Sequence, residues 1–362
     1  MWRSRRVWIG LAVSLIFIVL FLYGTNFQEI GDAFADANYL LAFLSLPVYF
    51  LAAWFRTLRW KFLLRPLTNV STVRLYPVVI IGFMANNLIP ARVGEVVRAY
   101  ILRERERVGI GASLGTIVVD RLFDGLTLIP LLAAAAAFAG RDVSFPIVGG
   151  LDVGFQGLAV LMAALFGIAF VLLLILAVSP AWRDRADRLS RRLTPSRLRP
   201  AVEGLLHSFF DGLRALRSPV DMALAGGASV ISWLLEATMY YMVGQAFNLD
   251  VGFHVYLLVT AAANLAIAVL ASQGGVGPFE FVTKKTVIAF GVGAGPATAY
   301  AVALHALLLF PVIMLGLFFL WYINLSLGDM LRRPVAASET ASTGSVEPPR
   351  GGHLGVEGRR GR

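Results

Sequence analysis

Six apolar stretches constrain the fold of this chain more than any other feature of its sequence. A helix of about 20 mostly apolar residues crosses roughly 30 Å of hydrocarbon. The stretches cover residues 7–23, 39–55, 111–139, 155–178, 222–247 and 297–325. Because only 15% of the residues are charged, against about 25% in an ordinary soluble domain, a water-soluble fold could not bury so much apolar surface. The sequence therefore predicts an all-α integral membrane protein with about six full transmembrane helices.

The distribution of the basic residues predicts the orientation of the chain. Most Lys and Arg residues fall in five patches, at residues 3–6, 56–74, 98–107, 183–217 and 332–362. The loops around residues 29–36, 142–152 and 250 carry acidic residues and almost no basic ones. Because basic loops stay in the cytoplasm, we expect both termini there and a multi-pass protein of the cell membrane. The net charge of +10 is thereby explained without a nucleic-acid partner, and no nucleic-acid-binding motif accompanies it.

Cysteine and histidine give no sign of a metal site. The chain has no cysteine, and His207, His254, His305 and His353 lack the spacing of metal ligands. We therefore expect neither a metal nor a cofactor. His305 lies in an apolar stretch, where a hydrogen-bonded structural role is favoured over that of a ligand or a proton relay.

A further apolar stretch, residues 75–98, is interrupted and predicts a re-entrant hairpin. Asn86, Asn87 and Pro90 break it, and it continues through Gly94 toward the next basic patch. Because basic patches flank it on both sides, the chain must enter and leave the membrane from the cytoplasm.

A second interrupted stretch, residues 254–295, predicts a hairpin from the opposite face. It breaks within ASQGGVGPFE, residues 271–280, and the neighbouring spans place both of its ends outside. The two breaks have similar patterns, Pro90-x-x-x-Gly94-Glu95 and Gly274-Gly275-x-Gly277-x-x-Glu280. The similarity indicates either the inverted repeat of a transporter or the general frequency of Gly and Pro where membrane helices break, and both alternatives remain open.

Charged residues within an apolar stretch indicate a site, because an unpaired charge at the bilayer centre costs several kcal/mol. Asp120, Arg121 and Asp124 interrupt the stretch 111–139. Asp120 and Asp124 share a helical face, and Arg121 lies three residues before Asp124. They form either a structural ion pair that joins two helices or the charged wall of a polar cavity.

The first hairpin carries residues suited to an anion. Arg92, Glu95 and Arg98 recur every three residues and would share one face of a helix that begins near Gly94. Arginine grips phosphate through parallel hydrogen bonds. Pro90 breaks the helix and exposes backbone groups.

The second hairpin is less specific. Gly274, Gly275 and Gly277 remove side chains from the break, and Glu280 follows in the first turn of the next helix. Glu280 either caps that helix or contributes to the site. Lys284 could neutralise it or attract an anionic headgroup.

Three motifs in order carry a family resemblance: NNLIPARVGEVVR at 86–98, VDRLFDG at 119–125 and SQGGVGPFE at 272–280. They resemble the lysylphosphatidylglycerol synthase transmembrane family, the flippase-like membrane domain of multiple peptide resistance factor proteins. The resemblance covers about residues 39–325 and implies movement of lipids, notably aminoacylated phosphatidylglycerol, between leaflets. Gln273 departs from the proline that is frequent in the family, and Asp120 replaces a common glutamate.

The resemblance also implies site residues. It carries over Pro90, Arg92, Gly94, Glu95, Arg98, Arg121, Asp124, Gly274, Gly275, Gly277 and Glu280. Asn86, Asn87, Asp120 and Gln273 complete the expected substrate-binding set. Arg92, Arg98 and Arg121 are expected to pair with the phosphate of an anionic or zwitterionic headgroup. We expect a lipid translocator without a catalytic motif; the alternative is a membrane enzyme, or the partner of one, acting on polyprenyl-phosphate-linked sugars, with Asp120 and Asp124 as a metal-binding pair.

The sequence also predicts one transmembrane domain over residues 1–330, with an Arg-rich cytoplasmic linker at 181–219 and a disordered tail at 331–362. The linker is either a helix on anionic lipid or a solvated one. Synthases of the family add an aminoacyl-transfer domain after the membrane part, whereas a low-complexity tail follows here, so we expect no aminoacyl-tRNA chemistry. The expected partners are membrane lipids with phosphate headgroups, a separate lipid-modifying enzyme and further copies of the chain.

Overall fold

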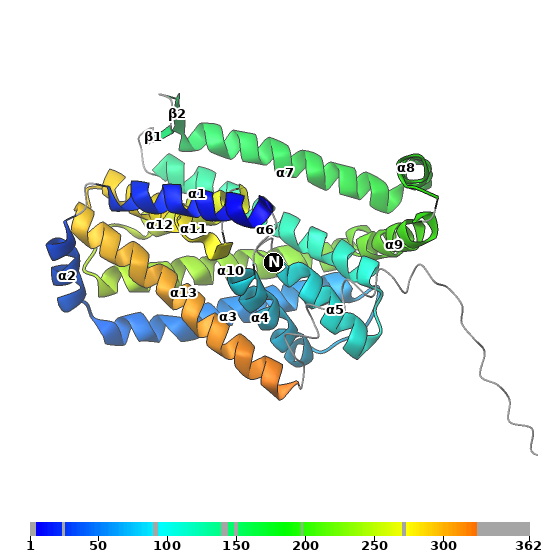
Figure 1. Ribbon diagram of the computed structural model, residues 1–362, viewed down its shortest axis with the longest axis horizontal. Coiled ribbons are helices and arrows are strands. Elements are labelled where there is room, and N and C mark those ends of the chain that lie inside the picture. Colours follow the sequence, from blue (N-terminus) through cyan, green and yellow to red (C-terminus); the bar gives the residue numbers. More distant parts are fainter. Residues whose placement is uncertain are drawn as a thin grey trace, which may run out of the picture.

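The computed structural model describes residues 5–23, 26–89, 93–138, 144–147, 151–196, 198–269 and 273–323. Within them the chain is a bundle of helices (Figure 1) with one short two-stranded hairpin. The tail predicted to be disordered at 331–362 lies outside the described residues.

The chain has two halves joined by a strand pair and a group of further helices. The first half contains α1 (Arg5–Leu22), α2 (Phe27–Ala35), α3 (Tyr39–Leu64), α4 (Thr72–Leu88), α5 (Gly94–Glu106) and α6 (Ile110–Phe138). The antiparallel strands β1 (Ser144–Ile147) and β2 (Leu151–Gly154), α7 (Phe155–Val178), α8 (Pro180–Leu193), α9 (Arg199–Gly212) and the 3₁₀ helix η1 (Leu213–Arg217) follow. The second half contains α10 (Pro219–Ala246), α11 (Phe253–Val269), the 3₁₀ helix η2 (Gln273–Gly275), α12 (Pro278–Ala289) and α13 (Ala294–Tyr322).

Several helices are suited to a bilayer. In the described part of the chain, α3, α7, α10 and α13 give four helices long and apolar enough to cross a membrane. The bent pair α1 and α2, whose axes differ by 85°, would give a fifth. The helical membrane architecture is therefore confirmed, whereas the count of six spans stays a prediction. The linker predicted at 181–219 covers α9, η1 and all of α8 except its first residue, Pro180.

Two sets of four helices repeat the same order of elements. α3, α4, α5 and α6 form a long helix, a broken hairpin and a second long helix, and α10, α11, α12 and α13 do the same. α3 packs along α10, while α4 packs on α13 and α11 packs on α6. Small residues such as Ala53 on α3 and Ala225 on α10 are buried, and small buried residues allow membrane helices to pack closely.

Each broken hairpin returns to the end from which it started. Arg74 near the start of α4 and Glu106 at the end of α5 form an ion pair of 3.7 Å. The rings of His254, at the start of α11, and Phe290, just after α12, have centroids 5.9 Å apart. The paired helices of each hairpin are therefore antiparallel.

The basic segments gather at one end of the bundle, where α8 and α9 lie, and α2 lies at the opposite end (Figure 1). Arg65 just after α3 contacts Asp221 at the start of α10 at 3.0 Å, and Arg105 donates to the carbonyl of Ile323 at 3.0 Å. At the other end, the amide of Asn38 donates to the carbonyl of Ala246 at 2.8 Å.

Candidate functional site

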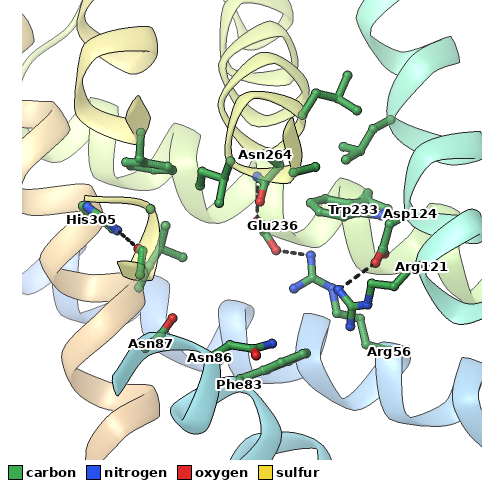
Figure 2. A pocket seen from close by; sticks show the side chains of 18 of the residues that line it. Arg56, Phe83, Asn86, Asn87, Arg121, Asp124, Trp233, Glu236, Asn264 and His305 are labelled. Atoms are coloured by element: carbon green, nitrogen blue, oxygen red, sulfur yellow. Dashed lines mark hydrogen bonds and ion pairs between the residues drawn. The ribbon is translucent and has the colours of Figure 1, made fainter. Parts of the chain in front are cut away.

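A polar cavity of about 370 Å³ lies between the two halves of the bundle (Figure 2). Long helices, both hairpins and η2 contribute to its wall. Its polar and aromatic lining includes Tyr49, Arg56, Phe83, Asn86, Asn87, Glu95, Arg121, Asp124, Trp233, Glu236, Tyr240, Asn264, Phe279 and His305. Because the surrounding helices are apolar, these charges are set in a low-dielectric environment where pairing matters.

Asn86 shapes the break of the first hairpin. Its Oδ1 accepts the backbone N–H of Gly94 at 2.7 Å, and its Nδ2 donates to Oε1 of Glu95 at 3.2 Å. A side chain at Gly94 would collide with the carbonyl oxygen of Gly82 and with Asn86, so only glycine allows α4 and α5 to approach here. Asn86 and Glu95 line the cavity, and Gly94 lies behind them.

Asp120 takes part in an ion-pair network that joins three helices. Arg59 on α3, whose side chain is 1% exposed, donates to Asp120 at 2.7 Å and to Asp124 at 2.8 Å. Arg98 on α5 donates to the second oxygen of Asp120 at 3.2 Å, and its guanidinium lies 4.1 Å from the ring centroid of Trp60. This is the structural ion pair that the sequence left open.

The position of Arg98 differs from the one expected from the sequence. It was expected to face the anion together with Glu95, but its side chain is 2% exposed and does not line the cavity. Residues three apart on a helix point in directions about 60° apart, and here that difference is enough to direct Glu95 into the cavity and Arg98 toward Asp120.

Arg121 and Asp124 form the charged wall that was the other alternative. Arg121 lies 3.1 Å from Asp124 and 3.8 Å from Glu95, and 39% of its side chain is exposed. In Figure 2 Arg121 and Asp124 lie next to Arg56 on one side of the cavity. Asp120 therefore belongs to the buried ion-pair network and Arg121 to the cavity wall, while Asp124 takes part in both.

The same side of the cavity contains a pair that the sequence analysis missed. Arg56 on α3 forms an ion pair with Glu236 on α10 and stacks 4.2 Å from the ring centroid of Trp233 (Figure 2). Glu236 also accepts hydrogen bonds from Asn264 at 3.2 Å and Tyr240 at 3.4 Å. A lone glutamate inside the apolar stretch 222–247 was a detectable signal, whereas Arg56 was read as the start of a cytoplasmic basic patch.

The second break is closed by Glu280 and His305. Glu280 accepts the N–H of Gly277 at 2.7 Å and contacts Nδ1 of His305 at 2.7 Å. His305 lines the cavity, and its Nε2 contacts the carbonyl of Gly274 at 3.0 Å. Gly274 and Gly277 have φ values of 61° and 95°, which side-chain-bearing residues rarely adopt.

The tips of the two hairpins meet at the cavity. A Cβ at Gly274 would lie 3.4 Å from the carbonyl oxygen of Asn87, at the end of α4, and η2 packs against α4. The two breaks are therefore close to each other, and it is the left-handed φ of Gly274 that favours glycine at this position.

The expected substrate-binding residues divide into three groups. Those lining the cavity are Asn86, Asn87, Glu95, Arg121, Asp124, Gly274 and Gly275. Those behind its wall are Gly94, Arg98, Asp120, Gly277 and Glu280. Pro90, Arg92 and the side chain of Gln273 lie outside the described residues. Apart from Arg98, whose side chain is turned away from the cavity, the role of these residues in binding a substrate stays a prediction.

The lining charges are mixed in sign. Arg56 and Arg121 line the cavity together with the carboxylates of Glu95, Asp124 and Glu236. Within the described residues no three His, Cys, Asp or Glu side chains gather in a way that could hold a metal ion. Such a cavity can accommodate a group that carries both a positive and a negative charge.

Comparisons with known proteins agree with the motifs. The family model described as the lysylphosphatidylglycerol synthase TM region matches residues 7–316, which include all three motifs. A UPF0104 membrane protein of Methanothermobacter thermautotrophicus is 26% identical over 317 residues, 84% of this chain and 91% of that protein. A UPF0104 membrane protein of Methanocaldococcus jannaschii is 22% identical over 232 residues, 64% of this chain and 90% of that protein.

A relative with an enzyme name also matches. Glycosyltransferase AglD of Haloferax volcanii is 26% identical over 328 residues, which are 84% of this chain and 52% of AglD. The chain thus spans about half the length of that relative.

Proposed function

Because this chain belongs to the lysylphosphatidylglycerol synthase transmembrane family, we propose that it moves a phospholipid with a charged headgroup between the leaflets of the membrane. The headgroup occupies the cavity, and the acyl chains remain in lipid. Four buried atoms of the lining residues support this proposal. Within the described residues, Nε of Arg56, Oε2 of Glu95, Nε of Arg121 and Nε1 of Trp233 lack a hydrogen-bond partner, and such groups call for a ligand or an ordered water.

The mixed charges favour a headgroup of both signs, as in an aminoacylated phosphatidylglycerol. A phosphate entering this environment must exchange its hydration for charge-assisted hydrogen bonds of about 1.5–3 kcal/mol each. Arg121 offers such bonds because it is the most exposed arginine of its ion-pair cluster. Glu95 offers an acceptor for an ammonium group beside it.

The proposal includes an inverted repeat with re-entrant hairpins. It is supported by the antiparallel course of each hairpin and by the meeting of the two breaks. It is also supported by equivalent pairs in the two halves. Glu95 lies 3.8 Å from Arg121, 121 − 95 = 26 residues later, and Glu280 lies 2.7 Å from His305, 305 − 280 = 25 residues later.

The proposed orientation has both termini in the cytoplasm, with residues 1–330 as one transmembrane domain. The gathering of Arg65, Arg105 and the α8–α9 segment at one end of the bundle supports it, because basic residues mark the cytoplasmic side. The proposed count of six spans adds α1 and α6 to the four helices named above.

The test is lipid movement in reconstituted vesicles. Vesicles containing aminoacylated phosphatidylglycerol are treated with a membrane-impermeant amine reagent, which modifies only headgroups that reach the outer leaflet. The intact chain should expose inner-leaflet lipid over time, Arg121→Gln should slow this, and Arg199→Ala on the surface of α9 should not. Equal rates for protein-free vesicles and the intact chain would overturn the proposal.

A second candidate function is that of an enzyme, or the partner of one, acting on polyprenyl-phosphate-linked sugars. The similarity to a glycosyltransferase favours it, although only about half of that relative is shared. A polyprenyl-phosphate sugar supplied in the same vesicles distinguishes the two candidates. A changed product without movement of the aminoacylated lipid would favour the enzyme.

A further inference from the structure

His305 has an acceptor at each ring nitrogen. Its Nδ1 lies 2.7 Å from Oε1 of Glu280, and its Nε2 lies 3.0 Å from the carbonyl oxygen of Gly274. The residue is 5% exposed, so water does not readily replace either partner. A carbonyl oxygen only accepts hydrogen bonds, so Nε2 must carry a hydrogen.

The second contact requires one more proton. An ionised carboxylate also only accepts, so Nδ1 of His305 needs a hydrogen as well, and the imidazole is then cationic. Otherwise Glu280 is protonated and donates to Nδ1. In both cases the pair holds one proton more than a neutral histidine and an ionised glutamate.

We infer that His305 and Glu280 form a proton-binding site that closes the break between α11 and α12. The carboxylate of Glu280 also accepts the N–H of Gly277 at 2.7 Å. The single proton therefore completes a chain of contacts from Gly277 through Glu280 and His305 to Gly274. When the proton leaves, a ring nitrogen without hydrogen faces an acceptor oxygen, and one of the two contacts of His305 is lost.

Opening of this break acts on the cavity directly. Gly274 and His305 line the cavity, and η2, which contains Gly274, packs against α4, which carries Asn87 near its end. Loss of the hydrogen bond from His305 to the Gly274 carbonyl allows η2 to move away from the tip of the first hairpin. The coupling of this step to lipid movement rests on the proposed function, whereas the proton site does not.

The equivalent pair in the first half cannot act in this way. Glu95 faces Arg121 there, and an arginine keeps its proton at all relevant pH values. The pseudo-equivalent hairpins thus differ in one respect: only the pair with a histidine can release its proton, because histidine, unlike arginine, has a neutral form in proteins.

Other charged groups face the region from the neighbouring elements. Arg56 and Tyr49 of α3, Glu95 of α5, Arg121 and Asp124 of α6, and Glu236 and Tyr240 of α10 line the same cavity. On α12, Lys284 donates to the carbonyl of Phe21 and Lys285 lies over the ring of Phe281. Glu29 of α2 and His254 of α11 lie at the far ends of α13 and α12, against Gly295 and Phe290. The two ring nitrogens of His305 themselves contact Glu280 and Gly274.

The experiment measures the accessibility of a single introduced cysteine next to the break, because the chain has no cysteine of its own. Leu309→Cys places a thiol in the cavity beside Gly274, whose Cβ would lie 3.9 Å from the Leu309 side chain. The rate of maleimide labelling is measured in nanodiscs from pH 5 to pH 9. Each rate is divided by that of the same variant unfolded in dodecyl sulfate at the same pH, which removes the titration of the thiol itself.

The normalised labelling should rise with pH, by up to about tenfold per pH unit across the transition for one proton. Glu280→Gln should abolish the rise, because a glutamine amide donates to Nδ1 of His305 and its oxygen still accepts from Gly277, with no added proton. The matched control His254→Gln should behave as the parent. A flat profile in the parent, or an unchanged rise in Glu280→Gln, would overturn the inference. A rising profile together with no lipid movement would overturn the proposed function alone.

Discussion

The buried arginine Arg59 should be essential for stability, although it does not line the cavity. Its guanidinium donates to Asp120, Asp124 and Ser229 at 2.7, 2.8 and 2.9 Å. Replacing it with methionine keeps much of the side-chain volume but leaves two carboxylates without their shared partner. Removing one partner of a buried ion pair costs about 3–5 kcal/mol, so Arg59→Met should reduce the free energy of unfolding by that amount.

The same helix provides the control. Arg65, just after α3, pairs with Asp221 at 3.0 Å, but 42% of its side chain is exposed. Exposed ion pairs contribute about 0–1 kcal/mol, so Arg65→Met should change the free energy of unfolding by no more than that. Both variants remove one positive charge, but Arg59 is buried between two carboxylates whereas Arg65 is partly exposed beside one.

A second substitution tests whether the loss arises from charge. In the network, the three arginines Arg59, Arg98 and Arg121 face the three carboxylates Asp120, Asp124 and Glu95. Arg59→Met leaves one carboxylate in excess, and adding Asp124→Asn restores the balance. The double variant should therefore recover part of the stability.

The measurement is reversible unfolding in mixed micelles, followed by tryptophan fluorescence with increasing dodecyl sulfate. Arg59→Met should also retain the fold at low temperature, judged by a single symmetric peak in size-exclusion chromatography. If the free energies of unfolding of Arg59→Met and Arg65→Met differ by less than about 1 kcal/mol, the network does not stabilise the protein and the reasoning is wrong.

Three further predictions concern the break, the cavity and the orientation. Gly94→Ala should lower the free energy of unfolding by roughly 1–3 kcal/mol because the new methyl group has no room. Gly204→Ala on α9, with no atom within 4 Å of the new Cβ, should be neutral or stabilising. Thermal melts of the two variants test this difference. Glu236→Gln should slow lipid movement by about tenfold, the loss of one charge-assisted hydrogen bond of about 1.5 kcal/mol, and an unchanged initial rate in vesicles would exclude Glu236 from the site. A cysteine at position 250 should react with an impermeant reagent only from outside the cell and one at position 199 only after permeabilisation, and the reverse pattern would invert the orientation.

Much of the cavity lining could be predicted, because a polar residue inside an apolar stretch must either pair with another polar residue or line a cavity. The breaks at Asn86 and Gly274 were visible as interruptions of apolar stretches, and both lie at the cavity. Glu236 was equally visible and was overlooked. Arg56 could not be assigned, because its position at the boundary between an apolar stretch and a basic patch fits a cytoplasmic loop as well as a cavity wall.

The sequence by itself determined that the chain forms apolar helices, where two of them break, and to which family it belongs, because hydropathy, Gly and Pro act within short segments. Only the tertiary structure decided which charges meet. Asp120 pairs with Arg59, 61 residues away, and Arg56 with Glu236, 180 residues away. It also turned Arg98 away from the cavity and placed His305 on Glu280. Such pairings depend on the rotation of each helix about its own axis. Helix–helix packing sets this rotation, and the local sequence pattern alone does not specify it.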